Sequence, residues 1–321
     1  MVVKVFVVDD SAVVRQALAH MLAGNAEVVL IGSAPNPLLA MAAMRKNPPD
    51  VLLLDIEMPG MDGLTFLRQI MASNPIPTVI CSTLSTEGSR VALDALAAGA
   101  VAVLAKPKLG LKQHLDDSRH EMIQTLKNAA RSRPRARGAL PAAVHKPATG
   151  AFDGGATPVA SRTSVLAGVR AFAMNKPVVI GSSTGGTQAL ELVLTSLPSD
   201  APGIAITQHM PEKFTAMYAQ RLDAICAMNV REAKDGDRLE RGVALIAPGG
   251  RHMQLQKANG QYHVKVLDGP PVNRHKPSVD VLFKSAAECA GRDALGIIMT
   301  GMGDDGARGM KTMHDVGART L

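Results

Sequence analysis

The chain has 321 residues, 46% of them hydrophobic, which is enough for two ordinary domains and excludes a chain that is disordered throughout. It has no tryptophan and only 2% aromatic residues, which argues against a stacking platform for single-stranded nucleic acid. The formal net charge is +7, but residues 106–150 alone carry 10 basic and 3 acidic groups, so the basic balance belongs to one segment.

The N-terminal segment turns acidic at Asp9 and has neither the basic start nor the cleavage site of a signal peptide. No apolar run approaches the roughly 20 residues that are needed to cross a bilayer. The chain has three isolated cysteines, which show neither disulfide nor metal-ligand spacing: Cys81, Cys226 and Cys289. We therefore expect a soluble protein of the reducing cytoplasm, without membrane insertion.

The N-terminal part alternates short apolar runs with amphipathic stretches. The pattern predicts five strands, near residues 3–8, 27–32, 50–54, 77–82 and 101–104, with a helix after each. Continuous aliphatic runs indicate strands that are buried on both faces, as in a parallel sheet. The predicted fold is a doubly wound (βα)5 domain with helices on both sides, over residues 1–131.

A segment rich in proline, glycine and arginine follows at residues 132–172 and shows no sustained periodicity. Its basic groups are not interleaved with aromatic residues, so we interpret it as a flexible tether rather than an arm that binds nucleic acid. We therefore place a second domain at residues 173–321.

The second domain again alternates strands and helices, with strands predicted near residues 178–181, 203–208, 243–247 and 295–300. Two further short runs flank Asn259-Gly260, a dipeptide that favours a tight β-hairpin. The fold class of the whole chain is therefore α/β, with two doubly wound domains and a hairpin inserted in the second.

Polar residues stand where strands of the first domain end. In a parallel sheet these positions meet at one edge. They are Asp9, Asp10, Asp55, Ser82 and Lys106. Three carboxylates repel one another unless a cation lies among them, and an oxygen-rich site suits Mg2+. With a fixed cation at Lys106 and a hydroxyl at Ser82, the set could accept a phosphoryl group on Asp55.

This constellation resembles the receiver domain of response regulators, over about residues 1–130. The resemblance implies that a histidine kinase phosphorylates Asp55. It also implies that Asp10 and Asp55 ligate Mg2+ with the help of Asp9, and that Ser82 and Lys106 change on phosphorylation.

An apolar run in the second domain meets the sequence Gly181-Ser182-Ser183-Thr184-Gly185-Gly186, which matches the GxSxG nucleophile turn. Such a turn lifts one serine, here Ser183, above the sheet edge. The pattern alone also fits a phosphate-binding turn or a purely structural one.

Strand-end positions again supply partners for the serine. His209 follows one predicted strand, and Asp304-Asp305 follow another. A serine hydroxyl becomes a nucleophile when an imidazole takes its proton, and a carboxylate orients that imidazole. Spacing does not choose between Asp304 and Asp305. We interpret three other histidines as structural: His252, His263 and His275.

The serine turn resembles that of the chemotaxis response regulator protein-glutamate methylesterases, the CheB family. Further matches are Thr207 to Pro211, Ala247 to Gly249, Val272 to His275, Pro277 to Asp280 and Thr300 to Gly306. The resemblance implies Ser183 as nucleophile, His209 as base and Asp305 as its orienter. It also implies hydrolysis of glutamate methyl esters on chemoreceptor helices, with glutamine deamidation.

The backbone amides near Thr184 and Met302 are candidates for an oxyanion hole, because both lie on tight turns. Family members continue beyond residue 321, where this chain stops at the start of an expected strand, so we expect a truncated catalytic domain. Two alternatives stay open: a DNA-binding response regulator, and a phosphorylation-regulated docking protein whose hydrolase domain is inactive.

Overall fold

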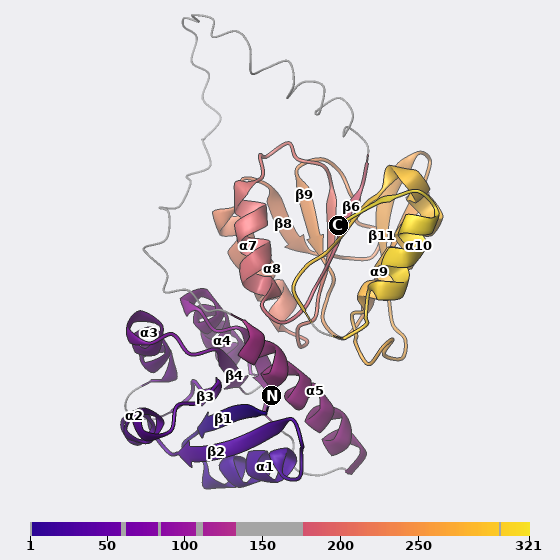
Figure 1. The fold of residues 1–321 in the computed structure, drawn as a ribbon. Helices are drawn as coiled ribbons and strands as arrows, with labels where there is room; N and C mark the ends of the chain where they lie inside the picture. The colour runs from indigo at the N-terminus through magenta and orange to yellow at the C-terminus, as the bar shows by residue number, and fades with distance from the viewer. Residues whose placement is uncertain (1, 59–61, 83–84, 107–111, 133–175, 302) are drawn as a thin grey trace, which may run out of the picture.

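A computed structural model describes residues 2–58, 62–82, 85–106, 112–132, 176–301 and 303–321, which form two α/β domains (Figure 1). No helix among these described residues is both long and apolar enough to cross a membrane. The predicted fold class is confirmed for both domains. Most of the predicted tether lies outside the described residues.

The N-terminal domain contains one parallel sheet with the strand order β2-β1-β3-β4-β5. Its strands are β1 Val3–Val8, β2 Val28–Ala34, β3 Val51–Asp55, β4 Thr78–Ser82 and β5 Ala102–Ala105. Its helices are α1 Ala12–Leu22, α2 Pro37–Lys46, α3 Gly63–Ser73, α4 Thr86–Ala98 and α5 Lys112–Arg131. The strand order reverses between β1 and β3, where ligands bind in open sheets of this kind.

Both faces of this sheet are covered because its strands carry apolar side chains on both sides. Alternate residues of β1 and β3 face helices α1 and α5 on one side and helices α2, α3 and α4 on the other. Helices α1, α2 and α3 begin after Ser11, Asn36 and Asp62, whose side-chain oxygens accept hydrogen bonds from amides of the first turn.

The C-terminal domain contains a six-stranded parallel sheet with the order β13-β12-β6-β7-β9-β8. Its strands are β6 Val178–Ser182, β7 Ile204–Gln208, β8 Asn229–Glu232, β9 Val243–Ile246, β12 Leu295–Ile298 and β13 Arg319–Thr320. Strand β8 was not predicted, because its four residues alternate without an apolar run. The predicted strand 295–300 ends at Ile298, two residues earlier than expected.

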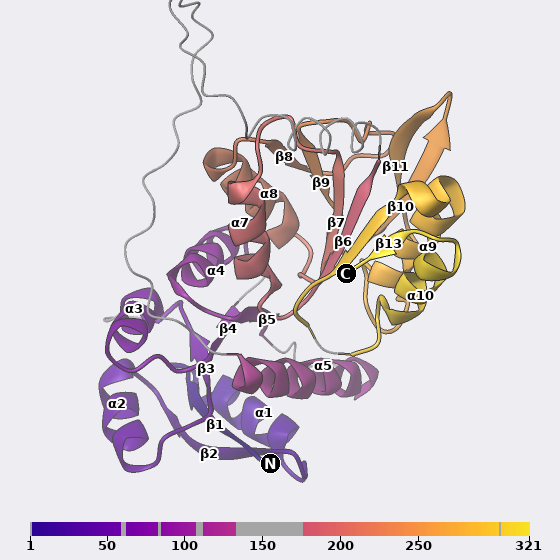
Figure 2. The same cartoon turned by 45° about the horizontal axis from the view of Figure 1, so that its top comes forward.

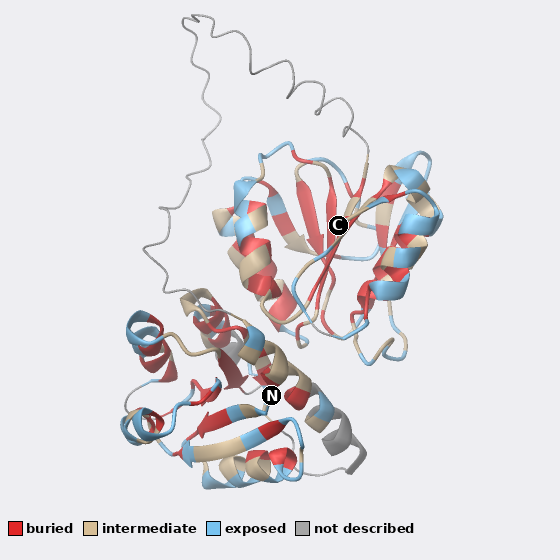
Figure 3. Cartoon of the chain, in the orientation of Figure 1, coloured by how far each residue is buried: buried red, intermediate tan, exposed pale blue. Residues whose placement is uncertain are grey.

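The predicted hairpin is confirmed as β10 His252–Ala258 and β11 Gln261–Leu267. Its turn residues Asn259 and Gly260 both have positive φ angles, 51° and 76°, as a tight hairpin turn requires. The hairpin packs on one face of the parallel sheet together with α9 Val279–Ala290 and α10 Ala307–Asp315. Helices α7 Gly186–Ser196 and α8 Phe214–Ile225 cover the other face (Figures 2 and 3).

The two domains contact each other beside the carboxyl edge of the second sheet. Helix α4 of the first domain packs against α7 and α8 of the second (Figure 2). Hydrogen bonds cross the interface at the N-terminus of α7, among them one from Asn128 Nδ2 to Thr184 Oγ1 at 3.4 Å. The Gly185 N–H donates to the Val101 carbonyl at 3.0 Å, and Gln188 Nε2 donates to the Ala100 carbonyl at 2.9 Å.

Candidate functional site

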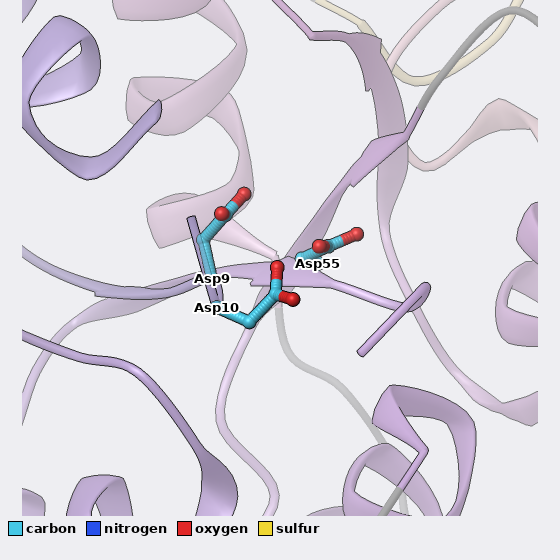
Figure 4. Close-up of side chains that lie close together, drawn as sticks. All are labelled: Asp9, Asp10 and Asp55. Atoms are coloured by element: carbon cyan, nitrogen blue, oxygen red, sulfur yellow. The ribbon is translucent and has the colours of Figure 1, made fainter. Parts of the chain in front are cut away.

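The sheet of the first domain brings its three acidic residues together, as predicted. One carboxylate oxygen from each of Asp9, Asp10 and Asp55 lies within 4.8 Å of the others (Figure 4). Asp9 and Asp55 are buried at the ends of β1 and β3, while Asp10 is exposed. Lys106, directly after β5, places its Nζ 2.7 Å from Asp55 Oδ2 and 3.3 Å from Asp9 Oδ2.

The electrostatics of this pocket favour a bound cation. Burial raises the pKa of Asp9, although the positive charge of Lys106 opposes the change. Burial also opposes the charge on Lys106, but the hydrogen bond and charge of Asp55 outweigh it and raise the lysine pKa. Asp9 Oδ2 is buried, and its partner among the described residues is the ammonium group of Lys106. A set of three carboxylates that supplies only oxygen ligands fits a hard divalent cation.

Ser82 lies at the same sheet edge. It is the last residue of β4 and is fully buried, and its register partner on β5 is Ala105, next to Lys106. The five polar residues that the sequence predicted for this sheet edge therefore all lie at it in the structure.

The serine turn of the second domain joins β6 to α7, as predicted. Ser183 directly follows β6, and Gly185 has a φ of 78°, a left-handed conformation that favours glycine. At Gly186 a Cβ atom would lie 1.8 Å from Ser182 Oγ, so the turn has no space for a side chain there. The sequence Gly185-Gly186 thus allows the chain to turn tightly behind Ser183.

Ser183, His209 and Asp305 form a continuous chain of contacts. Ser183 Oγ lies 3.1 Å from His209 Nδ1, and His209 Nε2 lies 2.8 Å from Asp305 Oδ2. These residues follow β6, β7 and β12, three strands that are neighbours in the sheet. Asp304, which spacing could not distinguish from Asp305, is exposed, whereas Asp305 is buried.

The carboxylate of Asp305 is fixed by donors from the loop before α9 and from the start of that helix. Ser278 Oγ and the Val279 N–H each donate to it at 2.7 Å, and Asn273 Nδ2 donates at 2.9 Å. Burial would raise the pKa of Asp305, but hydrogen bonds from His209, Ser278 and Asn273 outweigh burial and lower it. The group is therefore an anion next to His209 at neutral pH.

One of the three histidines that we interpret as structural, His275, lies directly against the proposed base. His275 stacks its ring on that of His209, with 3.7 Å between ring centroids and 8° between ring planes. Burial and the nearby charge of His209 lower its pKa from 6.5 to about 4. His252, in contrast, contacts the Pro270 carbonyl and accepts a hydrogen bond from the Ser278 N–H, and His263 pairs with Gln256 in the hairpin.

Of the two oxyanion candidates, Thr184 lies directly after Ser183 at the start of the turn. Its N–H donates no hydrogen bond to any residue that the structure describes. Met302 lies outside the described residues. Sequence reasoning missed Gln208, Asn273, Ser278 and Asp280 as neighbours of the site, although all four lie in the quoted motifs.

Comparison with known proteins agrees with this division of the chain. A family model described as the response regulator receiver domain matches residues 5–115, and one described as CheB methylesterase matches residues 178–321. A solved structure, the CheB methylesterase catalytic domain of Thermotoga maritima, is 37% identical and covers 46% of this chain and 78% of that chain, with a TM-score of 0.44.

Two curated relatives match nearly the whole chain. A protein-glutamate methylesterase/protein-glutamine glutaminase 2 from Dechloromonas aromatica is 54% identical over 99% of this chain and 87% of that protein. A protein-glutamate methylesterase/protein-glutamine glutaminase 1 from Xanthomonas oryzae is 55% identical over 98% of this chain and 88% of that protein. The chain belongs to the family of CheB methylesterases that carry an N-terminal response regulator receiver domain.

Proposed function

We propose that this chain hydrolyses glutamate methyl esters, and deamidates glutamine side chains, on the cytoplasmic helices of chemotaxis receptors. The names of the curated relatives give these two reactions. The observation that carries the proposal is the chain of contacts from Ser183 through His209 to Asp305. Both reactions are acyl transfers from a glutamyl carbonyl, so one site serves both.

In the first half of the reaction, Ser183 Oγ attacks the ester carbonyl while His209 takes its proton. The imidazolium forms against the Asp305 carboxylate, whose lowered pKa keeps it charged. The developing oxyanion accepts a hydrogen bond from the Thr184 N–H. The tetrahedral intermediate then expels methanol, or ammonia from an amide, with the proton returned by His209.

In the second half, a water molecule replaces the departed alcohol or ammonia. His209 takes a proton from this water, whose oxygen attacks the acyl-enzyme carbonyl. The bond to Ser183 Oγ breaks, the proton returns to the serine, and a glutamate carboxylate is released. No oxidant, reductant or metal is required for either half.

The first domain supplies regulation through Asp55, which we propose as the acceptor of a phosphoryl group from a histidine kinase. Asp9, Asp10 and Asp55 would hold Mg2+, which neutralises phosphoryl charge when it is bound. Lys106, whose Nζ contacts Asp55 Oδ2, and Ser82, at the end of β4, would bind the oxygens of the new phosphoryl group. Phosphorylation would break the ion pair between Lys106 and the Asp55 carboxylate, and it would add negative charge at this edge of the sheet.

The domain interface links that change to the second site. Ala100 and Val101, the two residues before β5, accept hydrogen bonds at the N-terminus of α7, one turn from Ser183. These contacts would hold the first domain where it restricts access to the serine. Phosphorylation would shift the equilibrium toward undocked molecules and raise activity. All three cysteines are free, which is consistent with the proposed cytoplasmic location.

The contacts in the second domain favour this function over an inactive docking protein, one of the two alternatives that the sequence left open. An inactive docking domain would not require a hydroxyl, an imidazole and a buried carboxylate that are linked by successive hydrogen bonds. A serine-directed acylating reagent tests the point: we expect one adduct, at Ser183, and none in Ser183→Ala. An adduct at another residue would contradict the assignment.

A further inference from the structure

Gln208, the last residue of β7, extends its side chain between the backbones of the nucleophile and the base. Its Nε2 donates to the Ser183 carbonyl at 2.9 Å and to the His209 carbonyl at 3.0 Å. Gln208 is only 2% exposed, so solvent does not replace these bonds if they are lost. One buried amide thus fixes two backbone carbonyls of the site.

The Ser183 carbonyl shares a planar peptide unit with the Thr184 N–H. In a trans peptide the C=O and the N–H of one unit point in opposite directions. The Gly186 N–H also donates to the Ser183 oxygen, at 2.8 Å, so two donors hold that oxygen. Because the oxygen is held on the side of Gln208, the Thr184 N–H is held on the opposite side of the turn.

The orientation of the Gln208 amide is itself restricted. The ideal Cβ position of Gly186 lies 2.5 Å from Gln208 Oε1, so the oxygen end of the amide packs closely against the glycine backbone. If the amide turned by 180°, Gln208 Oε1 would face the carbonyl oxygens of Ser183 and His209, and no hydrogen bond could form. The amide therefore has one favourable orientation, with both N–H groups directed at the carbonyls.

We propose that Gln208 is a positioning residue for acyl transfer, because it sets the peptide plane that presents the Thr184 N–H to the oxyanion. This inference rests on the proposed function. Gln208 has no contact with the substrate in this scheme and acts through Thr184. Loss of the Gln208 amide should therefore reduce the stabilisation of the transition state and leave the affinity for the ester substrate unchanged.

The test compares Gln208→Met, which keeps the side-chain length but has no donor, with Thr207→Val as the matched control. Thr207 precedes Gln208 on β7, is fully buried, and its Oγ1 has no hydrogen-bond partner among the described residues. For Gln208→Met in the full chain we expect kcat for methanol release to fall about 10- to 100-fold, with KM unchanged. Thr207→Val should stay within about twofold of wild type.

A boronic acid, which forms a tetrahedral adduct with a serine, gives an independent measure. Its inhibition constant should rise in Gln208→Met by the same factor by which kcat falls. If Gln208 had a purely structural role, the substitution would lower the fraction of active molecules. The active molecules would keep the wild-type kcat and the wild-type inhibition constant. That result, or a kcat equal to that of Thr207→Val, would overturn the inference.

Gln208→Glu is the alternative test variant if Gln208→Met does not fold. The new carboxyl can donate an O–H only when it is protonated, and burial raises its pKa. Its kcat, relative to wild type, should therefore increase as the pH falls. A ratio that is constant with pH would overturn the inference. Wild-type activity that survives in Ser183→Ala would contradict the proposed function itself, which these variants do not test.

Discussion

The imidazole rings of His209 and His275 lie parallel, with centroids 3.7 Å apart, so the proposed base rests on a second histidine. Burial and the charge of His209 lower the pKa of His275 to about 4. His275 therefore stays neutral at physiological pH and does not repel the proton that His209 accepts. It is a packing partner of the base rather than a second base.

His275 should make the folded protein sensitive to mild acid. Its pKa is about 4 in the folded state and 6.5 in the unfolded state, so between these values the unfolded chain binds more protons. The free energy of unfolding should therefore fall as the pH falls from 6.5 to 4, by at most about 3 kcal/mol from this group. Urea unfolding at several pH values measures this slope.

His275→Gln is the comparison for that experiment, since glutamine does not titrate. The variant should lose the part of the slope that lies between pH 6.5 and 4 and keep the part due to the carboxylates. Equal slopes in the two proteins would show that the histidine does not have a lowered pKa.

Asp280 supports the site from behind Asp305. Its Oδ1 accepts hydrogen bonds from the N–H groups of Gly306 and Gly309, and its Oδ2 accepts one from Asn273, which also donates to Asp305. In Asp280→Asn, an N–H₂ group would replace Oδ2 and face the N–H₂ group of Asn273. Both groups are hydrogen-bond donors, so the bond between residues 273 and 280 is lost. We expect a loss of about 1–3 kcal/mol in the free energy of unfolding and a lower kcat.

Asp315→Asn is the matched control, because Asp315 is an exposed residue of α10 that pairs with Lys311. It should change stability by less than about 0.5 kcal/mol. Chemical denaturation of the two variants beside wild type measures the difference, and equal stabilities would contradict the supporting role of Asp280.

The sequence was sufficient for the triad because its three residues follow strands of one parallel sheet. Strand ends converge whatever the details of the helices, so Ser183, His209 and the pair Asp304-Asp305 could be brought to one sheet edge from the strand pattern. The choice of Asp305 over Asp304 depends on side-chain direction, which spacing does not contain. The family resemblance supplied it.

His275 could not be placed in the same way. It lies in a loop whose path depends on two residues with left-handed backbone, Asn273 with φ 51° and Arg274 with φ 67°. Neither is glycine, so the only local signal for that turn is the preference of asparagine for the left-handed region, and Arg274 carries none. The short edge strand β8 was missed because its alternating residues are only partly buried.

Gly186 should tolerate no side chain. A Cβ there would lie 1.8 Å from Ser182 Oγ and 2.5 Å from Gln208 Oε1, both of them buried. Gly186→Ala should therefore lower the free energy of unfolding by about 1–3 kcal/mol and reduce methanol release. Gly269→Ala is the control, because its nearest neighbour would be a His252 ring atom at 3.6 Å. Equal melting temperatures in the two variants would argue against the tight turn.

Gln188 should restrain the unphosphorylated enzyme through its hydrogen bond to the Ala100 carbonyl. Gln188→Leu removes that bond and should raise basal methanol release without a phosphodonor, by about 2- to 10-fold for the loss of one hydrogen bond. Gln261→Leu, at the exposed start of β11, should leave the basal rate unchanged. A basal rate in Gln188→Leu equal to that of the control would show that this contact does not restrict access.

The most direct test of the proposed function is the initial rate of methanol release from a methylated receptor. It should be measured on the full chain before and after addition of a small phosphodonor with Mg2+, and on Ser183→Ala under the same conditions. We expect release by the wild type, an increase with the phosphodonor, and a loss of at least about 10³-fold in Ser183→Ala. Release by Ser183→Ala at the wild-type rate would contradict the role of Ser183 as the nucleophile.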